Sequence, residues 1–176
     1  MRHVTPGAAP CHPDRRGGPL LALLLVLPLG LAAQTTLFAG YSVHGVTDRP
    51  GAGYDGIQLG LAARLAPPVE WVVRLESLSG VLYDESSGIV SLSTGVQFGR
   101  FGTRGEAALG VGFGGYALTE YDSGGLGGFL YSNLDLRVWL GRHVGVYTGL
   151  RLSTYDGALR RGGASAAIGI TLRPGR

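Results

Sequence analysis

The chain has 176 residues with 15 basic and 12 acidic side chains, which gives a formal net charge of +3. This length suggests one domain. The basic residues, all of them arginine, form no patch with interleaved aromatic residues, so we expect no nucleic-acid partner. The chain holds one cysteine, Cys11, which excludes a disulfide bond within the chain.

An apolar run near the N-terminus, residues 19–33, follows Arg15 and Arg16 and ends in small residues. A positive segment, an apolar segment and a small-residue cleavage site are typical of a secretory signal peptide. We therefore predict a cleaved signal peptide over residues 1–33 and a mature domain over residues 34–176, with an uncleaved anchor as the alternative. Without this leader the formal net charge falls to about +1, because the leader carries three arginines and one aspartate.

Eight segments of the mature chain alternate between apolar and polar residues. In steps of two residues, the apolar face comprises 37–43, 57–65, 69–75, 90–98, 107–113, 130–140, 144–152 and 164–172. None of these positions is charged, and apart from the aromatic residues Tyr41 and Trp71 only Thr94, Ser132 and Thr148 carry a polar group. Because a period of two is the pattern of strands and not of helices, we predict eight β-strands.

The alternate face carries glycines and charged residues. Its central charged residues are Arg64, Glu70, Arg74, Glu76, Glu106, Asp135, Arg137 and Arg151. If the short break at 66–68 closes a hairpin, Arg64 lies opposite Glu70. Cross-strand pairs of opposite charge stabilise a sheet by about 0.2–1 kcal/mol each, so we expect this pair to bind.

The breaks between the segments alternate in length along the chain. The short breaks are 66–68, 100–105 and 141–143, and the longer ones are 47–55, 77–88, 120–128 and 156–163. An up-and-down meander places its short and long connections at opposite ends. We therefore predict an all-β fold, an eight-stranded antiparallel up-and-down β-barrel.

Two kinds of barrel have alternating strands, and they differ in which face points inward. A soluble lipocalin-like barrel turns its apolar face inward around a small apolar ligand, whereas a transmembrane barrel turns that face outward to lipid. The interior of an eight-stranded barrel is just wide enough for side chains to fill it. Inward glycines would leave room there for arginines and glutamates to pair, so we favour the transmembrane barrel. The secreted soluble barrel is the alternative.

Aromatic residues gather near the ends of the predicted strands. Those near the short breaks are Trp71, Phe98, Phe101 and Trp139, and those near the longer breaks are Tyr54, Tyr83, Tyr116, Tyr121, Phe129, Tyr131 and Tyr155. Transmembrane barrels carry an aromatic girdle at each interface between lipid and water. We therefore expect two girdles, although Trp139 and Tyr131 share the parity of the polar face.

With this pattern over residues 34–176, the chain resembles the small eight-stranded outer-membrane barrels of the outer membrane protein A and X type. The resemblance implies an outer-membrane location, short periplasmic turns, longer outer loops, and the lipid bilayer and the outer-membrane assembly machinery as partners. The last strand of that family often carries a polar-x-Gly-x-x-hydrophobic-x-aromatic assembly signal. Its positions here hold Ser165, Ala167, Ile170 and Leu172, with alanine replacing glycine and leucine replacing the aromatic residue.

Few residues outside the charged face suggest a catalytic or ligand-binding site. The GxGxxG match at 110–115 leads into a glycine-rich segment and not into a helix, so we expect no nucleotide site. Ser42 and His44 share one face of a strand and, with a nearby acid, could form the relay of a lipid-modifying hydrolase. The mature chain has no cysteine and two distant histidines, His44 and His143, so we expect no metal and no other cofactor.

The favoured function is that of a non-enzymatic membrane scaffold whose loops face outward. Its lumen would hold the charged residues as a packed, salt-bridged filling, with a narrow gated pore as a lesser possibility. A soluble barrel that binds an apolar ligand is the second candidate, and a lipid-modifying barrel enzyme is the third. The sequence identifies no partner of the loops.

Overall fold

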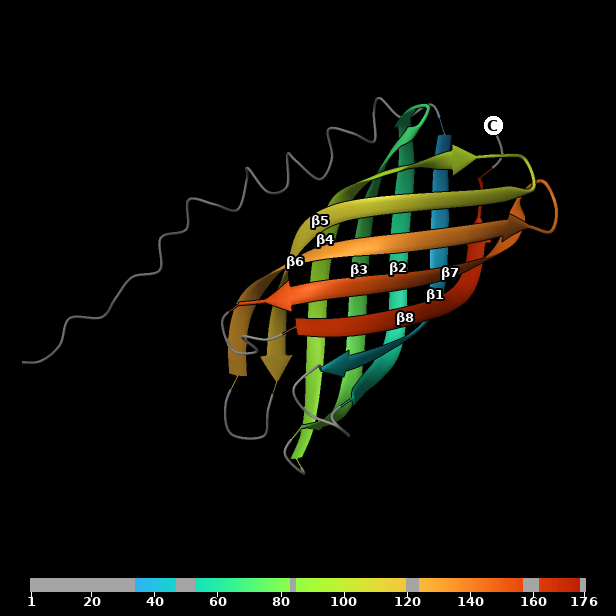
Figure 1. Cartoon of the computed structure of the whole chain (residues 1–176). Coiled ribbons are helices and arrows are strands. Elements are labelled where there is room, and N and C mark those ends of the chain that lie inside the picture. The colour runs from blue at the N-terminus through green and yellow to red at the C-terminus, as the bar shows by residue number, and fades with distance from the viewer. Residues whose placement is uncertain (1–33, 47–52, 83–84, 120–123, 157–161, 175–176) are drawn as a thin grey trace, which may run out of the picture.

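The computed structural model describes residues 34–46, 53–82, 85–119, 124–156 and 162–174. Its strands are β1 (Gln34–Val46), β2 (Gly53–Ala66), β3 (Val69–Leu82), β4 (Glu85–Phe101), β5 (Gly105–Thr119), β6 (Gly124–Trp139), β7 (Val144–Tyr155) and β8 (Gly162–Leu172). Each strand pairs antiparallel with the next, and β1 pairs with β8, so the strands close a barrel (Figure 1). The predicted eight-stranded antiparallel barrel is confirmed. Within the described ranges, no helix has the length and apolar character needed to cross a membrane.

The two ends of the barrel differ in their connections. The β2–β3, β4–β5 and β6–β7 hairpins close at one end, which also holds the start of β1 and the end of β8. We call this the turn end, and the opposite end the loop end. The β2–β3 turn consists of Pro67 and Pro68, which are joined by a cis peptide bond. The short connections therefore lie at the breaks predicted from the sequence.

The strands continue further toward the loop end than the sequence predicts. The expected loop over residues 77–88 is wrong, because β3 and β4 both extend into it and pair there, with Gly80 opposite Ser87. Serine and glycine dominate this stretch and obscure its strand character. The period of two nevertheless continues through it, since Leu78 and Ile89 are buried on the inward face.

The burial of the side chains settles which face points inward. Outward-facing Leu109 is 65% exposed and Leu130 is 68% exposed, whereas inward-facing Glu70 is 1% exposed. The apolar face therefore forms the outer wall, as expected for a barrel of the transmembrane type. The soluble alternative requires the opposite arrangement. Two positions with outward parity, Ala63 and Trp71, are register partners and are buried.

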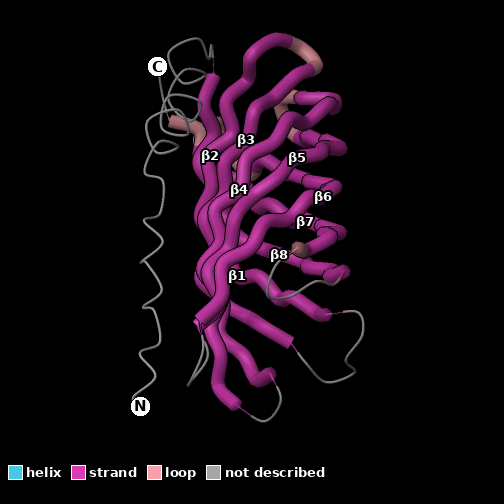
Figure 2. Tube along the Cα trace, turned by 90° about the vertical axis from the view of Figure 1, so that its left-hand side faces the viewer, coloured by secondary structure: helices cyan, strands magenta, loops and turns pink. Residues whose placement is uncertain are grey.

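The barrel closes where β1 meets β8 (Figure 2). Gly40 lies opposite Gly169 at this seam. A Cβ atom added at Gly40 would lie 2.9 Å from the Cα atom of Gly169 and 2.8 Å from the hydroxyl oxygen of Tyr147. The two glycines therefore allow the Tyr147 side chain to cover the seam from inside the lumen.

The expected aromatic girdles are largely absent from the described outer wall. Tyr54, Tyr116, Phe129 and Tyr131 are buried inside the barrel, and so is Trp139 at the turn end. Their positions follow the inward parity of the charged residues, which overrides their closeness to the strand ends. The expectation of two girdles is therefore wrong for these residues. The remaining members show no common pattern: Trp71 is buried, Phe98 is exposed, Phe101 and Tyr155 are partly buried, and Tyr83 and Tyr121 lie outside the described residues.

Candidate functional site: the barrel lumen

The polar face lines the lumen of the barrel. Its eight charged residues come from five strands: Arg64 from β2, Glu70, Arg74 and Glu76 from β3, Glu106 from β5, Asp135 and Arg137 from β6, and Arg151 from β7. Seven of them are buried, and Arg64 is partly buried at the turn end. The structure therefore places all eight candidate residues in the same interior space.

An ionic cluster fills the lumen at the turn end. The Glu106 carboxylate accepts hydrogen bonds from Arg64 at 3.1 Å, from Arg173 at 2.7 Å and from Arg137 at 3.2 Å. Glu70 accepts two hydrogen bonds from Arg137, at 3.0 and 2.8 Å. Such two-pronged contacts are the strong form of an arginine–carboxylate pair. We call these five side chains the turn-end cluster.

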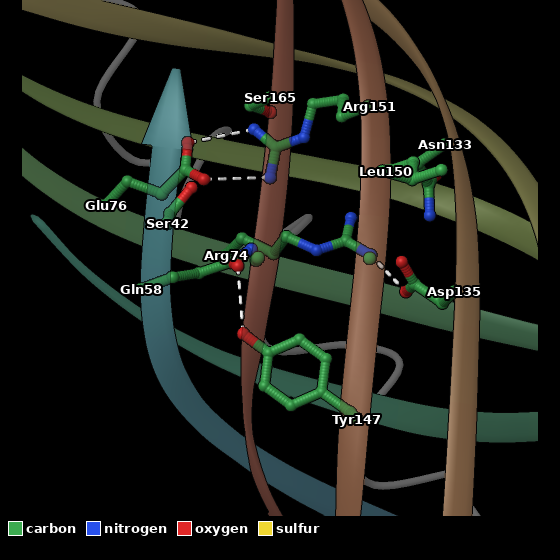
Figure 3. A pocket seen from close by; sticks show the side chains of 12 residues that line it. Ser42, Gln58, Arg74, Glu76, Asn133, Asp135, Tyr147, Leu150, Arg151 and Ser165 are labelled. Atoms are coloured by element: carbon green, nitrogen blue, oxygen red, sulfur yellow. Dashed lines mark hydrogen bonds and ion pairs between the residues drawn. The ribbon is translucent and has the colours of Figure 1, made fainter. Parts of the chain in front are cut away.

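Two further ion pairs cross the middle of the lumen (Figure 3). Arg74 pairs with Asp135, and Arg151 binds Glu76 through hydrogen bonds of 2.8 and 3.0 Å. The Gln97 amide also donates to Asp135, at 2.6 Å. These contacts join β3 to β6 and to β7, which are not its neighbours in the wall. The ion pairs therefore connect strands on opposite sides of the lumen.

The ion pairs differ from the pair expected at the β2–β3 hairpin. The register does place Arg64 opposite Glu70, as predicted. Arg64 nevertheless binds Glu106, and Glu70 binds Arg137. The reason lies in closure of the barrel, because long inward side chains reach partners on the far wall of a narrow lumen. The expected ion pair is therefore wrong, although the register behind it is confirmed.

An aromatic cap fills the lumen at the loop end. We use this name for Tyr54, Leu78, Ile89, Tyr116, Leu118, Phe129, Tyr131 and Tyr155. The Tyr155 ring lies 5.3 Å from the Phe129 ring and 5.6 Å from the Tyr116 ring, measured between centroids. These distances are typical of favourable aromatic pairs. A signal for the cap exists in the sequence, because its residues share the parity of the charged residues.

Little empty space remains between the aromatic cap and the turn-end cluster. A cavity of about 10 Å³ lies beside Ser42, Gln58, Asn133, Arg74 and Arg151 (Figure 3). This volume holds about one water molecule. The Ser42 hydroxyl and both amide atoms of Asn133 are buried without a hydrogen-bond partner among the described side chains. A water molecule in the cavity would thus find polar partners.

Ser42 and His44, the candidates for a hydrolase relay, both face the lumen from β1. The His44 ring contacts Tyr155, with 3.2 Å between Nε2 and the hydroxyl oxygen, whereas the Ser42 hydroxyl has no partner among the described residues. A nucleophile and its base must meet within hydrogen-bond reach, and these two do not. Over the described ranges, no three side chains of the types that ligate metals come together.

The outer wall is hollowed over β5 to β8. The hollow has a volume of about 560 Å³ and lies where the small side chains of Ser132 and Ala164 stand among leucines such as Leu109, Leu134 and Leu152. The outward-facing residues that line it carry no charge. Its lining therefore suits hydrocarbon chains.

Comparison with known proteins identifies the fold of this chain but not its family. The chain matches no family model, and no curated protein matches it. Neisserial surface protein A has a similar structure, with a TM-score of 0.62 and 10% identity over 79% of this chain and 95% of that chain. The outer membrane protein OprG from Pseudomonas aeruginosa follows, with a TM-score of 0.60 and 8% identity over 82% of this chain and 97% of that chain.

An outer-membrane enzyme, PagL, also has a similar structure. Its TM-score is 0.53, with 13% identity over 77% of this chain and 97% of that chain. Identities this low show a shared fold and not a shared activity. The chain thus has the fold of the small eight-stranded outer-membrane barrels.

Proposed function

We propose that this protein is an integral barrel of an outer membrane and acts there as a non-conducting scaffold. The observation that carries the proposal is the inversion of the usual burial pattern, with apolar residues outside and ion pairs inside. Exposed apolar patches of soluble monomers rarely exceed a few hundred Å². On this barrel the apolar wall includes exposed leucine, isoleucine, valine and phenylalanine side chains, and all eight strands contribute to it. A lipid bilayer provides the apolar surroundings that such a wall requires.

The route to the membrane follows from the N-terminal segment. We infer that residues 1–33 are a signal peptide that is removed during export. In support, the apolar run over residues 19–33 follows Arg15 and Arg16 and ends in small residues. The partners would then be the bilayer itself and the outer-membrane assembly machinery. The latter would act on β8, which carries Ser165, Ala167, Ile170 and Leu172 at the positions of the assembly signal.

The filled lumen supports a scaffold rather than a pore. Conduction would require the aromatic cap to open at the loop end. It would also require the bonds of Glu106 and Glu70 to break at the turn end. Removing one partner of an ion pair buried this deeply strongly destabilises the folded protein. We infer that the barrel is a rigid frame that holds its loop end at the membrane surface.

The enzyme alternative has less support. The fold is shared with PagL, which is an enzyme, but at 13% identity. Ser42 and His44 face a lumen that is closed by the aromatic cap and the turn-end cluster, so a lipid on the outer wall would not reach them. We therefore propose a function without catalysis.

Membrane fractionation combined with gel mobility before and after boiling tests the scaffold proposal. We expect the protein in the outer-membrane fraction, with a folded band that shifts on boiling. Recovery as a soluble periplasmic or secreted protein would overturn the proposal. In that case, N-terminal sequencing of the mature chain would still test removal of residues 1–33 separately.

A further inference from the structure

Charge is distributed unevenly between the two ends of the barrel. Arg100, Arg104 and Arg142 are exposed at the turn end, and no described side chain forms an ion pair with them. The acidic residues of that end, Glu70 and Glu106, are buried within the turn-end cluster. The described acidic residues that are exposed, Asp55 and Asp156, both lie at the loop end. The exposed charge of the described turn end is therefore positive.

Backbone hydrogen bonds tie the segments that carry these arginines to one another. The Trp139 amide donates to the Arg104 carbonyl at 2.9 Å, which joins the β4–β5 turn to the end of β6. The Arg173 amide donates to the His143 carbonyl at 2.8 Å, which joins the β6–β7 turn to the end of β8. These turns lie together at one end of the barrel (Figure 1). Arg100, Arg104 and Arg142 thus stand on one continuous edge, which we call the basic rim.

The basic rim begins where the apolar wall ends. Arg100 is two residues beyond Phe98 on the outward face of β4, and Phe98 is 56% exposed. Arg142 is two residues beyond Leu140, which is 72% exposed. In a membrane, the apolar residues would lie at the edge of the hydrocarbon. The guanidinium groups would then reach the depth of the lipid headgroups, as arginine side chains near an interface do.

We propose that the basic rim binds the phosphate groups of anionic phospholipids in the leaflet at the turn end. This inference rests on the proposed membrane function and adds a ligand class to it. Arginine is suited to the task because its planar fork of donors matches the oxygens of a phosphate. A zwitterionic headgroup carries its own cation beside the phosphate. The rim therefore favours phosphatidylglycerol over phosphatidylcholine.

Spin-labelled lipids measure this preference directly. The barrel is folded into vesicles of equal parts phosphatidylcholine and phosphatidylglycerol, and electron paramagnetic resonance gives the relative association of each labelled lipid with the protein. An interfacial arginine contributes enough to enrich an anionic lipid roughly fivefold. We expect enrichment of this order for the unaltered protein, and a loss of it at high salt. Equal association of the two lipids would overturn the proposal.

Matched variants locate the site. The triple variant Arg100→Gln, Arg104→Gln and Arg142→Gln should associate with both lipids nearly equally. The control replaces Arg49, Arg160 and Arg161 by glutamine, which removes the same charge from the connections of β1 to β2 and β7 to β8. We expect the control to keep the enrichment. Loss of enrichment in the control alone would overturn the assignment to the basic rim.

Three further measurements distinguish the reasons for which the expected enrichment could be absent. Gel mobility before and after boiling shows whether each protein is a folded barrel in the vesicles. If the unaltered protein does not insert, the membrane function itself fails. If the triple glutamine variant does not fold, the three single glutamine variants take its place, and each should lose part of the enrichment. Inorganic phosphate that displaces labelled phosphatidylglycerol at equal concentration would show a site for a soluble anion and overturn the lipid assignment.

Discussion

Glu106 accepts hydrogen bonds from arginines in three separate parts of the chain. Arg64 lies on β2, Arg137 on β6, and Arg173 directly after β8. A carboxylate can serve this many donors because its two oxygens offer about four acceptor positions. The turn-end cluster therefore depends on one acidic residue more than on any of its arginines.

Replacing Glu106 by glutamine should destabilise the folded barrel by about 3 kcal/mol, because arginines in the lumen lose their shared counter-charge. Urea titration of the protein in vesicles, followed by gel mobility, measures this change. Asp55→Asn is the matched control, since Asp55 is exposed at the loop end and accepts a hydrogen bond from Tyr41 there. Equal unfolding midpoints for the two variants would contradict the role of Glu106.

Gly112 on β5 makes room for the Tyr131 ring of the aromatic cap. A Cβ atom added at Gly112 would overlap the Tyr131 ring and the Thr94 carbonyl oxygen, whereas one added at outward-facing Gly115 would come no closer than 3.7 Å to another atom. We expect Gly112→Ala to cost about 1–3 kcal/mol, as overpacked interiors do. Gly115→Ala should leave stability nearly unchanged. The same urea titration compares the two, and a larger effect at Gly115 would show that the cap is loosely packed.

At the scale of the strand, the cost of placing a charge on the outward face of β6 depends on the depth of that position in the membrane. Leu136→Arg would place a charge well inside the apolar wall and should cost about 2–4 kcal/mol. Leu140→Arg at the turn end should cost about 0–1 kcal/mol, because an arginine near the interface keeps its head in water. The fraction of each variant that reaches the heat-modifiable form in the outer membrane checks this. Normal assembly of Leu136→Arg would indicate that β6 does not face lipid.

The period of two in the sequence was sufficient to predict the eight strands, the face that points inward and the register at the β2–β3 hairpin. It did not predict how far β3 and β4 extend toward the loop end. The position of Arg64 opposite Glu70 follows from the short break at 66–68, and in the structure it includes a register shift between Arg64 and Ala66. The binding of Arg64 to Glu106 does not follow from the sequence, since the tilt of the strands decides which residues meet across the lumen. The aromatic cap was missed for a related reason. Because its aromatic residues are near strand ends, we expected them at the interface between lipid and water. Their parity along the strands, which carries more weight, instead places them inside the barrel.

At the scale of the molecule, the lumen is closed by two unlike barriers in series. The aromatic cap excludes water at the loop end, and the turn-end cluster occupies the lumen with paired charges. We expect no unitary conductance steps when the purified protein is inserted into planar bilayers. The double variant Tyr116→Ala and Phe129→Ala should also remain closed, because the turn-end cluster is intact. Stable steps from the unaltered protein would favour the gated pore instead.

The seam between β1 and β8 ties the first part of the barrel to the last. Leu37 pairs with Leu172, and Tyr41 pairs with Ile168, so β1 has a free edge until β8 has been synthesised. An unpaired edge is a template for association with other chains. Contacts between such distant residues also form slowly, because a long loop must close first. If the protein is exported as proposed, the chain would cross the periplasm before this seam closes, and protection from aggregation during that interval would be as necessary to its maturation as the final bilayer.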